Sequence, residues 1–403
     1  MSKLLIRWLA GREEVHVAQT REEREALYAL RYEVYGLEKG WAFGGVDHAR
    51  KRVFDESDEH PSSRHLYAGS MPGSEIKGTL RCRIFEPGQA PESFAGPFGL
   101  AKIPGVERYR IGELGRFAIR KEHRGGVVMP ALVRGVAEKF VGEEGVDLLF
   151  CECRPHMVKH YRKMGFRPYD TPNIETSEGL SVPLVLVPSD DAHMRKFAPL
   201  FAADTRAAVR QAGRPQVDLR AMASIWANER LRMLDESREV FAELERSAVR
   251  MEGISQNFPL SRTIIEEGAR AGFLLDVDAG ENLMREGRGE REAFLVLEGR
   301  VEVLVAGSSL RSLGPGELLG EMSWFLEGGR RTATVRAQSR CRVLVVDRKF
   351  VDELALRDPH AALDVYRAIG KSMAQRLDSL SQALAERDAR LAVLTGAADS
   401  KSG

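Results

Sequence analysis

The spacing of apolar side chains predicts alternating strands and helices over the first 190 residues. Residues 14–20 alternate apolar and polar side chains, as a strand with one buried face does, and residues 21–36 then place apolar side chains at helical spacing. Thr20 and Glu23 have the spacing of a capping box, which favours a helix start at residue 21. Further segments with a strand or helix pattern are, in order, 65–68, 77–84, 109–119, 130–140, 148–153 and 156–164. This order predicts an α+β domain in which helices flank a mixed sheet.

One of these strands contains two glycines. Gly112 and Gly115 interrupt the pattern of residues 109–119, and glycine inside a strand often marks a β-bulge. We therefore expect the strand to bend at one of the glycines and to leave N–H groups between Leu114 and Ile119 without strand partners.

The pattern changes after residue 188. Residues 219–251 are rich in charge and carry an apolar stripe at helical spacing, which predicts either a connector helix packed on the flanking domains or a solvated linker helix. Short apolar strands separated by glycines follow, and residues 359–384 form one long amphipathic pattern. The tail 397–403 is polar, and we expect it to be disordered.

Length and charge narrow the class of protein. At 403 residues the chain is long enough for two or three domains. Sixty Lys and Arg against 59 Asp and Glu give a net charge of +1, so no overall field attracts nucleic acid or an anionic membrane. No apolar run reaches the ~18 residues of a transmembrane helix, and the N-terminus lacks the features of a signal peptide. Four cysteines do not form a disulfide framework, so a reducing cytoplasm is the expected setting.

The most specific chemistry lies between Leu313 and Val335. Gly320 and Glu321 open what the sequence predicts to be one helical turn, whose N–H groups can bind an anion. Arg331, ten positions after the glutamate, can close on the same anion with a forked guanidinium contact. Glu321 is then free to accept a hydrogen bond from a sugar hydroxyl. A pocket with these groups fits a phosphate, a ribose and a base.

This stretch, with the glycine-punctuated strands at 279–281 and 294–299, resembles the β-roll and phosphate-binding cassette of cyclic-nucleotide-binding domains. The resemblance covers roughly residues 260–390 and implies cAMP or cGMP as a regulatory ligand. It assigns to the pocket Gly320, Glu321 (ribose 2′-hydroxyl), Met322, Ser323, Arg331 (cyclic phosphate), Thr332 (phosphate or base) and Ala333. In this family the terminal helix closes over the nucleotide and pairs with a partner helix, which implies a homodimer. The alternative interpretation is a surface glycine loop with a solvated arginine.

The order of elements in the first half is that of the GNAT acyltransferase fold, and two sets of residues strengthen this resemblance. Residues 160–166 (HYRKMGF) look like the family's late helix-to-strand junction, where a tyrosine lies near the leaving thiol. A second set resembles the autoinducer synthases and the related N-acyl amino acid synthases, with R-x-x-V-[FY], Trp, D-x-x-D, G-x-x-R and E-x-x-R-F in that order. These positions are Arg31, Trp41, Asp55, Asp58, Arg81, Glu113, Arg116 and Phe117.

The resemblance implies transfer of an acyl group from a thioester to an amine, without a metal or prosthetic group. Such a reaction needs a neutral amine, donors for the developing oxyanion and a proton for the departing thiolate. Glu113 is the best candidate for a base or for a carboxylate that orients the amine, with Asp58 and Asp55 in support. An equally good interpretation of these carboxylates is a set of structural ion pairs with Arg31, Arg81 or Arg116.

Tyr161 is the candidate proton donor to the thiolate, and a core tyrosine is the alternative. The remaining candidate residues are Arg116 for catalysis and Arg31, Trp41, Asp55, Arg81, Phe117, Arg124 and Gly125 for substrate contacts.

The turn at residues 124–129 departs from the pattern of acetyl-coenzyme A users of this fold, which show R-x-x-G-x-G there. Arg124, Gly125 and Gly126 are followed by Val127, Val128 and Met129, so the later glycines are missing. Close approach of the backbone to a pyrophosphate therefore becomes less favourable. A carrier-protein pantetheine has no pyrophosphate, and this modestly favours acyl-carrier protein over acyl-coenzyme A as donor.

Together these patterns predict a GNAT-like N-acyltransferase domain at 1–200, a helical connector at 201–258, a cyclic-nucleotide-binding domain at 259–390 and a tail at 391–403. The predicted activity is acyl transfer to the amine of an amino acid or a related small amine, regulated by the nucleotide. Two alternatives use the same domains: a cAMP-regulated protein-lysine acetyltransferase, and a nucleotide sensor without catalysis. A transcription regulator is not expected, because the roughly twenty residues after the last helix are too few for a DNA-reading module.

Overall fold

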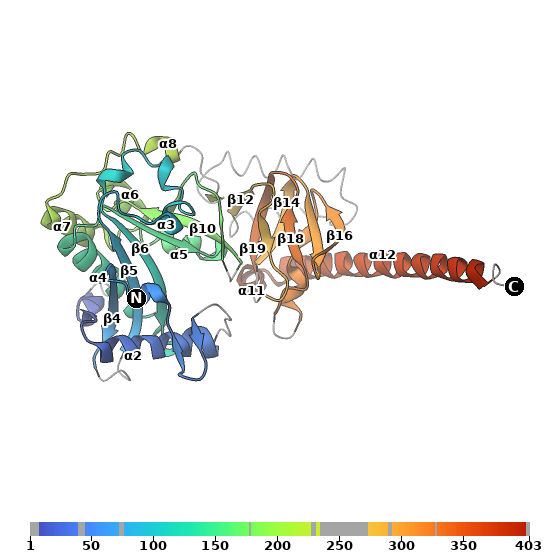
Figure 1. Cartoon of the computed structure of the whole chain (residues 1–403), viewed down its shortest axis with the longest axis horizontal. Helices are drawn as coiled ribbons and strands as arrows, with labels where there is room; N and C mark the ends of the chain where they lie inside the picture. The colour runs from blue at the N-terminus through green and yellow to red at the C-terminus, as the bar shows by residue number, and fades with distance from the viewer. Residues whose placement is uncertain are drawn as a thin grey trace. The chain divides into compact units, whose positions relative to one another are not determined.

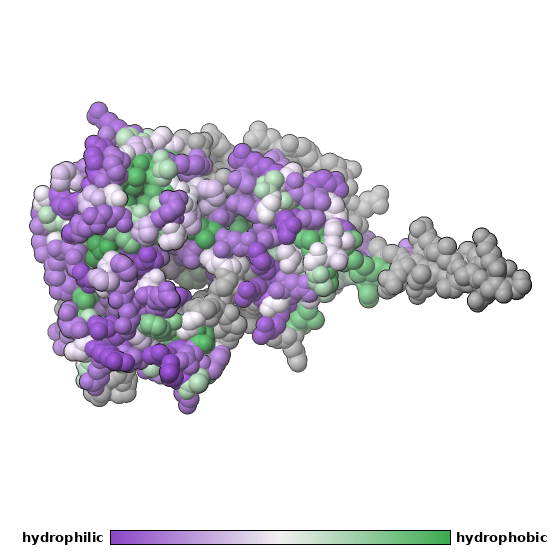
Figure 2. Space-filling view, viewed as in Figure 1, coloured by the Kyte–Doolittle hydropathy of each residue, from purple (hydrophilic) through white to green (hydrophobic). Residues whose placement is uncertain are grey.

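The computed structural model describes residues 8–38, 45–71, 76–176, 179–226, 231–233, 273–288, 292–326 and 329–399. The chain divides into two compact units near residue 231 (Figure 1). The visible surface is mostly hydrophilic, with small apolar patches (Figure 2). Among the helices in these ranges, none combines the length and the apolar character needed to cross a membrane.

The first unit is built on a mixed sheet with strand order β1-β4-β5-β6-β7-β10-β8, and β9 pairs with β10. Its strands are β1 (Val15–Val17), β4 (Ser63–Gly69), β5 (Ile76–Phe85), β6 (Ile111–Ile119), β7 (Leu148–Cys153), β8 (Arg167–Pro168), β9 (Ile174–Thr176) and β10 (Gly179–Leu186). The β6–β7 pair is parallel and all other pairs of this sheet are antiparallel. The chain passes between the parallel strands through α4 (Val128–Gly135) and its π-helical continuation Val136–Glu143.

The first helix, α2 (Arg21–Arg31), begins where the sequence predicts. The Thr20 hydroxyl accepts a hydrogen bond from the Glu23 N–H at 3.1 Å, and the Glu23 carboxylate accepts one from the Thr20 N–H at 2.7 Å. The predicted capping box is confirmed. The helix continues as a π-helical segment, Tyr32–Glu38, and its buried side chains pack on β3 (Arg52–Val53), β4 and β5.

Shorter elements complete the unit and cover a second, aromatic-rich core. They are β2 (Val46–Asp47), α3 (Glu92–Ala95), α5 (Val158–Arg162), α6 (Asp191–Phe197), α7 (Ala202–Ala212), α8 (Ala223–Trp226) and the 3-10 turns Glu56–Asp58, Leu100–Lys102, Val106–Arg108, Lys121–His123 and Pro155–Met157. In this core, Phe94 and Phe98 of the α3 region stack near Phe150 of β7. The core includes Ile111 of β6 and Leu148 and Phe150 of β7, which lie in the first part of each strand.

The second unit contains two sheets, with strand orders β11-β12-β19-β14-β17 and β13-β18-β15-β16. Their strands are β11 (Leu231–Met233), β12 (Phe273–Val277), β13 (Asn282–Met284), β14 (Glu292–Glu298), β15 (Val301–Val305), β16 (Ser308–Leu313), β17 (Leu318–Leu319), β18 (Thr334–Ala337) and β19 (Cys341–Asp347). The turn Glu321–Trp324 follows β17, and α11 (Arg348–Arg357) and α12 (Pro359–Asp399) end the described chain. The predicted α+β class is confirmed.

Two details differ from the sequence prediction. The helix α12 runs to Asp399, so the predicted tail at 391–403 begins inside a helix, because Ala and Leu are frequent in the first part of this stretch and no proline ends it. Within the predicted helix 219–251, the described residues form α8 and the strand β11, which joins β12 in a sheet. The rest of that helix, and most of the predicted connector beyond residue 226, lie outside the described residues.

Candidate functional site

The strands β6 and β7 separate part-way along their length. Their parallel pairing joins Ile111 to Leu148 and Glu113 to Phe150, and it ends there although β6 runs on to Ile119 and β7 to Cys153. Backbone groups of β6 that point toward β7 beyond Glu113 are therefore released from this ladder. Such groups can donate to a carbonyl oxygen placed between the strands.

A β-bulge lies in the same part of β6. Arg81 of β5 pairs with Gly115 and Thr79 pairs with Ala118, so Arg116 and Phe117 together stand opposite one residue of β5. Arg116 has a left-handed φ of 54°, which is uncommon for a residue other than glycine. The Tyr35 hydroxyl donates to the Phe117 carbonyl at 2.7 Å and holds the bulge from the π-helical segment.

The predicted bulge is therefore present, but it follows Gly115 and does not fall at Gly112. Gly112 is regularly paired, and a Cβ there would come within 2.6 Å of a Leu149 methyl group. Gly112 thus serves close packing of the strands. A Cβ at Gly115 would meet no other atom of the described residues within 4 Å, so this part of the structure leaves open space beside it.

Five of the predicted charged residues form one network next to the bulge. Arg31 donates to the Asp58 carboxylate at 2.8 Å, and Arg81 donates to Asp58 at 3.1 Å and to Asp55 at 2.8 Å. Arg116 donates to the other Asp55 oxygen through two nitrogens. The ion-pair interpretation of Asp55 and Asp58 is confirmed, and α2, β5, β6 and the Glu56–Asp58 turn are tied together by it.

The network keeps both aspartates ionised. Burial acts to raise the pKa of Asp58, but Arg31 and Arg81 outweigh it and lower that pKa below its ordinary value. For Asp55, burial is again outweighed, and Arg81 and Arg116 lower the pKa to about 2. With their oxygens engaged by guanidinium groups, these aspartates position the site, and they are poorly placed to accept a proton from a substrate.

His65 of β4 also belongs to the network. No sequence motif identified it as a site residue. Its Nδ1 lies 3.0 Å from an Arg31 nitrogen, and its Nε2 lies 2.8 Å from the Asp58 carbonyl oxygen. Burial, together with the charge of Arg31, lowers the pKa of His65 to about 4. The imidazole is therefore neutral, with Nε2–H donating to the carbonyl and Nδ1 accepting from Arg31.

Glu113 lies on the same sheet face but outside this network. Its carboxylate pairs with Arg83 of β5 at 3.1 Å, and the sequence gave Arg31, Arg81 and Arg116 as the expected partners. That expectation is wrong for Glu113, because the antiparallel register places Arg83 directly opposite it. Glu113 is thereby fixed in orientation and left partly exposed at the point where β6 and β7 part.

Tyr161 of α5 approaches the end of β7 on the side of Cys151 and Cys153. Burial raises the pKa of Tyr161 well above its ordinary value. Its ring makes an edge contact with Phe166 at a centroid distance of 5.9 Å. The phenol stays protonated and can act as a hydrogen-bond donor.

The turn after β6 holds the predicted Arg124 firmly. Its guanidinium donates to the Ile119 carbonyl at 2.9 Å and to both Glu38 oxygens at 2.5 and 2.6 Å. Gly125 follows with a left-handed φ of 72°. Trp41, the remaining predicted substrate contact, lies outside the described residues.

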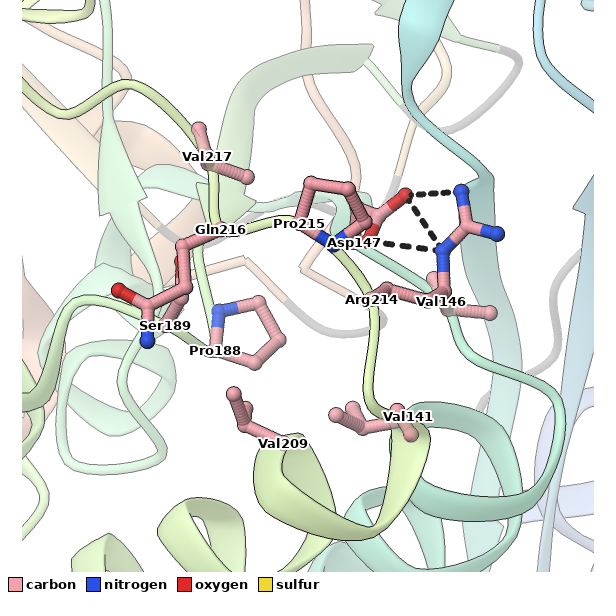
Figure 3. A pocket seen from close by; sticks show the side chains of 11 residues that line it. Val141, Val146, Asp147, Pro188, Ser189, Val209, Arg214, Pro215, Gln216 and Val217 are labelled. Atoms are coloured by element: carbon pink, nitrogen blue, oxygen red, sulfur yellow. Dashed lines mark hydrogen bonds and ion pairs between the residues drawn. The ribbon is translucent and has the colours of Figure 1, made fainter.

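A separate small pocket lies between the α7 region and the π-helical segment Val136–Glu143, as Figure 3 shows. The Asp147 carboxylate on its rim is paired with Arg214 at 2.8 Å and accepts the Arg110 N–H at 2.8 Å. None of the predicted site residues lines this pocket.

In the second unit, the Arg331 guanidinium packs directly against Gly320. Arg331 is only 3% exposed and donates to the Gly320 carbonyl at 2.8 Å and to the Glu292 carbonyl at 2.7 Å, while the Glu292 carboxylate lies 3.6 Å away. Gly320 has a φ of 84°, and a Cβ there would come within 2.3 Å of the Arg331 guanidinium. The interpretation of Arg331 as a solvated surface arginine is wrong.

Glu321 is buried and is contacted by the terminal helix. Arg376 of α12 donates to one Glu321 oxygen at 2.5 Å and pairs with Glu317 at 3.3 Å. Burial raises the pKa of Glu321, although Arg376 opposes this effect. The predicted approach of the terminal helix to the cassette is thus present as a specific side-chain contact.

The other predicted cassette residues surround these two. The Ser323 hydroxyl donates to the Gly320 carbonyl at 2.8 Å, Ala333 is buried, and Thr332 and Met322 are exposed and contact each other at 3.7 Å. Arg311 of β16 also faces Glu317 and Glu321, and burial beside Arg376 lowers its pKa. Arg311, Arg376 and Glu292 were missed because they come from distant elements and no local spacing connects them to the cassette.

Comparison with known proteins shows which families these two sites come from. Residues 26–190 match the family model of the N-acyl amino acid synthase FeeM, and residues 274–358 match that of the cyclic nucleotide-binding domain. The chain joins a FeeM-type synthase domain to a cyclic nucleotide-binding domain. Both resemblances drawn from the motifs are confirmed, and the FeeM-type domain is that of an N-acyltransferase.

Individual relatives are more distant. The chain is 26% identical over 109 residues to the Pycsar effector protein BcPycTIR of Burkholderia cepacia, which is 27% of this chain and 35% of that protein. It is 29% identical over 105 residues to the cAMP-activated global transcriptional regulator CRP of Salmonella typhimurium, which is 25% of this chain and 48% of CRP. The chain thus spans less than half the length of these curated relatives.

Among solved structures, that of FeeM, an N-acyl amino acid synthase from uncultured soil microbes, is similar to the synthase domain. The identity is 17% and the TM-score 0.36, with 45% of this chain and 94% of FeeM covered.

Proposed function

We propose that the chain is an N-acyltransferase that moves an acyl group from a pantetheine thioester to the amine of an amino acid or a related small amine. The observation that carries this proposal is the separation of β6 from β7 beside Glu113, within residues that match an N-acyl amino acid synthase. The separation supplies free backbone donors and an entry for the thioester. The Glu113 carboxylate supplies negative charge beside the site where the amine would bind.

The proposed reaction forms a C–N bond and breaks a C–S bond. The neutral amine attacks the thioester carbonyl, and the π electron pair moves to the oxygen, where β6 N–H groups donate to it. Collapse of this intermediate expels the thiolate, and the nitrogen loses one proton while the sulfur gains one. Tyr161, which its raised pKa keeps protonated, is the proposed donor to the leaving sulfur.

Acyl-carrier protein is the preferred donor in this proposal, with acyl-coenzyme A as the second choice. Arg124, which pyrophosphate users of this fold would direct at the ligand, is instead bound by Glu38 and the Ile119 carbonyl. A pantetheine without a pyrophosphate does not need this arginine. We also propose a reducing, cytoplasmic setting, in keeping with four cysteines that are all buried and unpaired.

The function is tested with the purified full-length chain. Acyl-carrier proteins and coenzyme A thioesters of several chain lengths are offered with each of the twenty amino acids, and products are identified by mass spectrometry. We expect an N-acyl amino acid and one equivalent of free thiol. Thiol release without amide, or acylation of lysine side chains on added protein in place of free amines, would contradict the proposal.

We expect Tyr161→Phe to lower kcat by about 10- to 150-fold, which corresponds to about 1.5–3 kcal/mol for a hydrogen bond to a charged group. Because the donor acts on charge that develops in the transition state, KM for the amine should change little. Tyr169→Phe is the matched control, since its hydroxyl donates to the Phe98 carbonyl at 2.6 Å inside the core. An unchanged kcat in Tyr161→Phe, with chemistry shown to be rate-limiting, would make Tyr161 a packing residue.

We further propose that cAMP or cGMP regulates the transferase. The nucleotide would bind at Arg331 and Glu321, where Arg376 already connects the pocket to α12. A homodimer through α12 is part of this proposal, and Leu363, Leu377 and Leu380 are exposed apolar residues on that helix. Regulation requires that the nucleotide bind two states of the protein with different affinity.

Saturating nucleotide is expected to change the apparent affinity for donor or amine by about 5- to 150-fold, the range of a coupling energy of about 1–3 kcal/mol. Linkage requires that bound acyl donor alter nucleotide affinity by the same factor, which titration calorimetry with and without donor measures. Full-length Arg331→Ala serves as the control, because the same response should require a roughly 30- to 5,000-fold higher nucleotide concentration. Identical donor affinity, amine affinity and kcat with and without nucleotide would show that the two domains are merely tethered.

A further inference from the structure

Glu152 of β7 lies at the open end of the separated strands. On one face of β7, Leu148 and Phe150 are buried in the aromatic-rich core, and Glu152 is the next residue on that face and is exposed. On β6, Ile111 and Glu113 occupy the same face, since they pair with Leu148 and Phe150. Glu152 therefore lies on the same sheet face as Glu113, two residues beyond Phe150, which is the last residue of β7 that pairs with β6.

The space opposite Glu152 is open. The next residue of β6 on this face is Gly115, where a Cβ would meet no atom of the described chain within 4 Å. On the far side of Gly115, Arg81 is occupied by Asp55 and Asp58, and Arg83 is occupied by Glu113. The Glu152 side chain makes no hydrogen bond or ion pair with another described residue. It is thus an exposed carboxylate without a structural partner, next to the gap that the thioester would enter.

We propose that Glu152 is the general base that takes the proton from the acceptor amine, and that Glu113, fixed by Arg83, orients that amine. This assignment rests on the proposed acyl transfer at the same strands. As the C–N bond forms, one N–H proton passes from nitrogen to the Glu152 carboxylate and then to solvent. The C–S electron pair leaves with the thiolate, which is protonated separately, so no further reactant is needed.

The surroundings of Glu152 suit this task. Although the side chain is exposed, the surrounding protein displaces part of its hydration and raises its pKa to about 7, Glu113 of β6 adds to the effect, and Arg116 of β6 opposes it. Tyr161, which approaches from α5, has a pKa raised well above its ordinary value and is neutral, as are the neighbouring thiols of β7. Pro183 of β10, which pairs with Glu152, brings no charge. A base with a pKa near the working pH combines a high ionised fraction with useful basicity.

The test measures kcat as a function of pH for the full chain, with donor and amine saturating. Wild type should lose activity as the pH falls through about 7, because protonated Glu152 cannot accept a proton. Glu152→Gln should lower kcat by about 10²–10⁴-fold and remove this acid limb. Glu152→Asp should restore part of the rate together with the limb, since it keeps the carboxylate.

Glu113→Gln separates the two carboxylates. Because the charge of Glu113 raises the pKa of Glu152, its removal should move the acid limb to lower pH while KM for the amine rises. Loss of the limb in Glu113→Gln, with the limb kept in Glu152→Gln, would reverse the assignment and make Glu113 the base. Glu138→Gln, an exposed change on the π-helical segment, is the control and should leave rate and limb unaltered.

The outcomes distinguish the two levels of the proposal. If wild type forms no amide with any donor and amine, the proposed function fails and the assignment of Glu152 fails with it. If wild type is active and Glu152→Gln keeps both the rate and the acid limb, only the assignment of Glu152 is overturned. Thermal unfolding of each variant confirms that an altered profile comes from a folded protein.

Discussion

Replacing Arg331 with alanine is expected to weaken cyclic-nucleotide binding by about 2–5 kcal/mol, the range for removing one member of a buried charge pair. This corresponds to a roughly 30- to 5,000-fold rise in Kd. The physical reason is that Arg331 is 3% exposed and is held by two carbonyl groups, so its fork is oriented before a phosphate arrives. An oriented guanidinium loses little side-chain entropy on binding.

The chain provides a matched control for this prediction. Arg330 is the preceding residue, is exposed and donates only to the Gly287 carbonyl at 3.0 Å. Arg330→Ala removes the same charge from the same loop and should change Kd by less than about threefold, in keeping with the small worth of exposed charges. Arg331→Lys keeps the positive charge but loses the planar guanidinium, so we expect a Kd between those of wild type and Arg331→Ala.

Isothermal titration with cAMP and with cGMP measures these affinities. Equal Kd values for wild type and Arg331→Ala would remove the phosphate-binding role of Arg331. Because Arg331 also holds Gly320 and Glu292, the variant is first checked for retained folding of the second unit. A melting point close to that of wild type shows that the lost affinity reflects the missing guanidinium and not a collapsed pocket.

The cassette was predictable from the sequence because its parts are close together in the chain. Gly320 and Glu321 open one turn, and Arg331 lies in the loop after it. The contact between Arg331 and Gly320 therefore joins residues only eleven positions apart. The structure explains the glycine at position 320, since a Cβ there would collide with the Arg331 guanidinium. Arg376 could not be predicted, because 55 residues and a helix separate it from the Glu321 that it contacts.

The acyl site was predictable only in part, because strand register decides which charges meet. The motifs identified Arg31, Asp55, Asp58, Arg81 and Arg116, and the structure joins all five. Spacing along the chain could not tell that Glu113 would face Arg83, since that contact is set by the register in which β5 and β6 pair.

Glu152 was missed for a related reason. Glu152 lies between two cysteines in an apolar run, so the sequence predicts only a polar residue within a strand. Its interest arises only because the neighbouring strand ends its pairing two residues earlier and carries a glycine opposite it.

The network around Asp58 leads to a second large expected effect. Asp58 is 2% exposed, and its carboxylate neutralises Arg31, which is fully buried, and Arg81. Asp58→Ala leaves two buried guanidinium groups without this partner, and we expect a loss of about 3–5 kcal/mol in the free energy of unfolding. Hydrogen exchange of peptides from β4, β5 and β6 reports this loss in the first unit alone.

The control and the pH dependence follow from the same contacts. Glu33→Ala breaks the more exposed pair with Arg120 and should cost no more than about 1 kcal/mol. In the folded state Asp58 and Asp55 have pKa values below those of an unfolded chain, so their contribution is complete above about pH 4 and is lost as the pH falls through the folded-state pKa, which for Asp55 is about 2. The difference in stability between wild type and Asp58→Ala should therefore be constant from neutral pH to about pH 4 and shrink below it. A difference below 1 kcal/mol at neutral pH would show that Arg31 and Arg81 find other partners and that the network does not hold the site together.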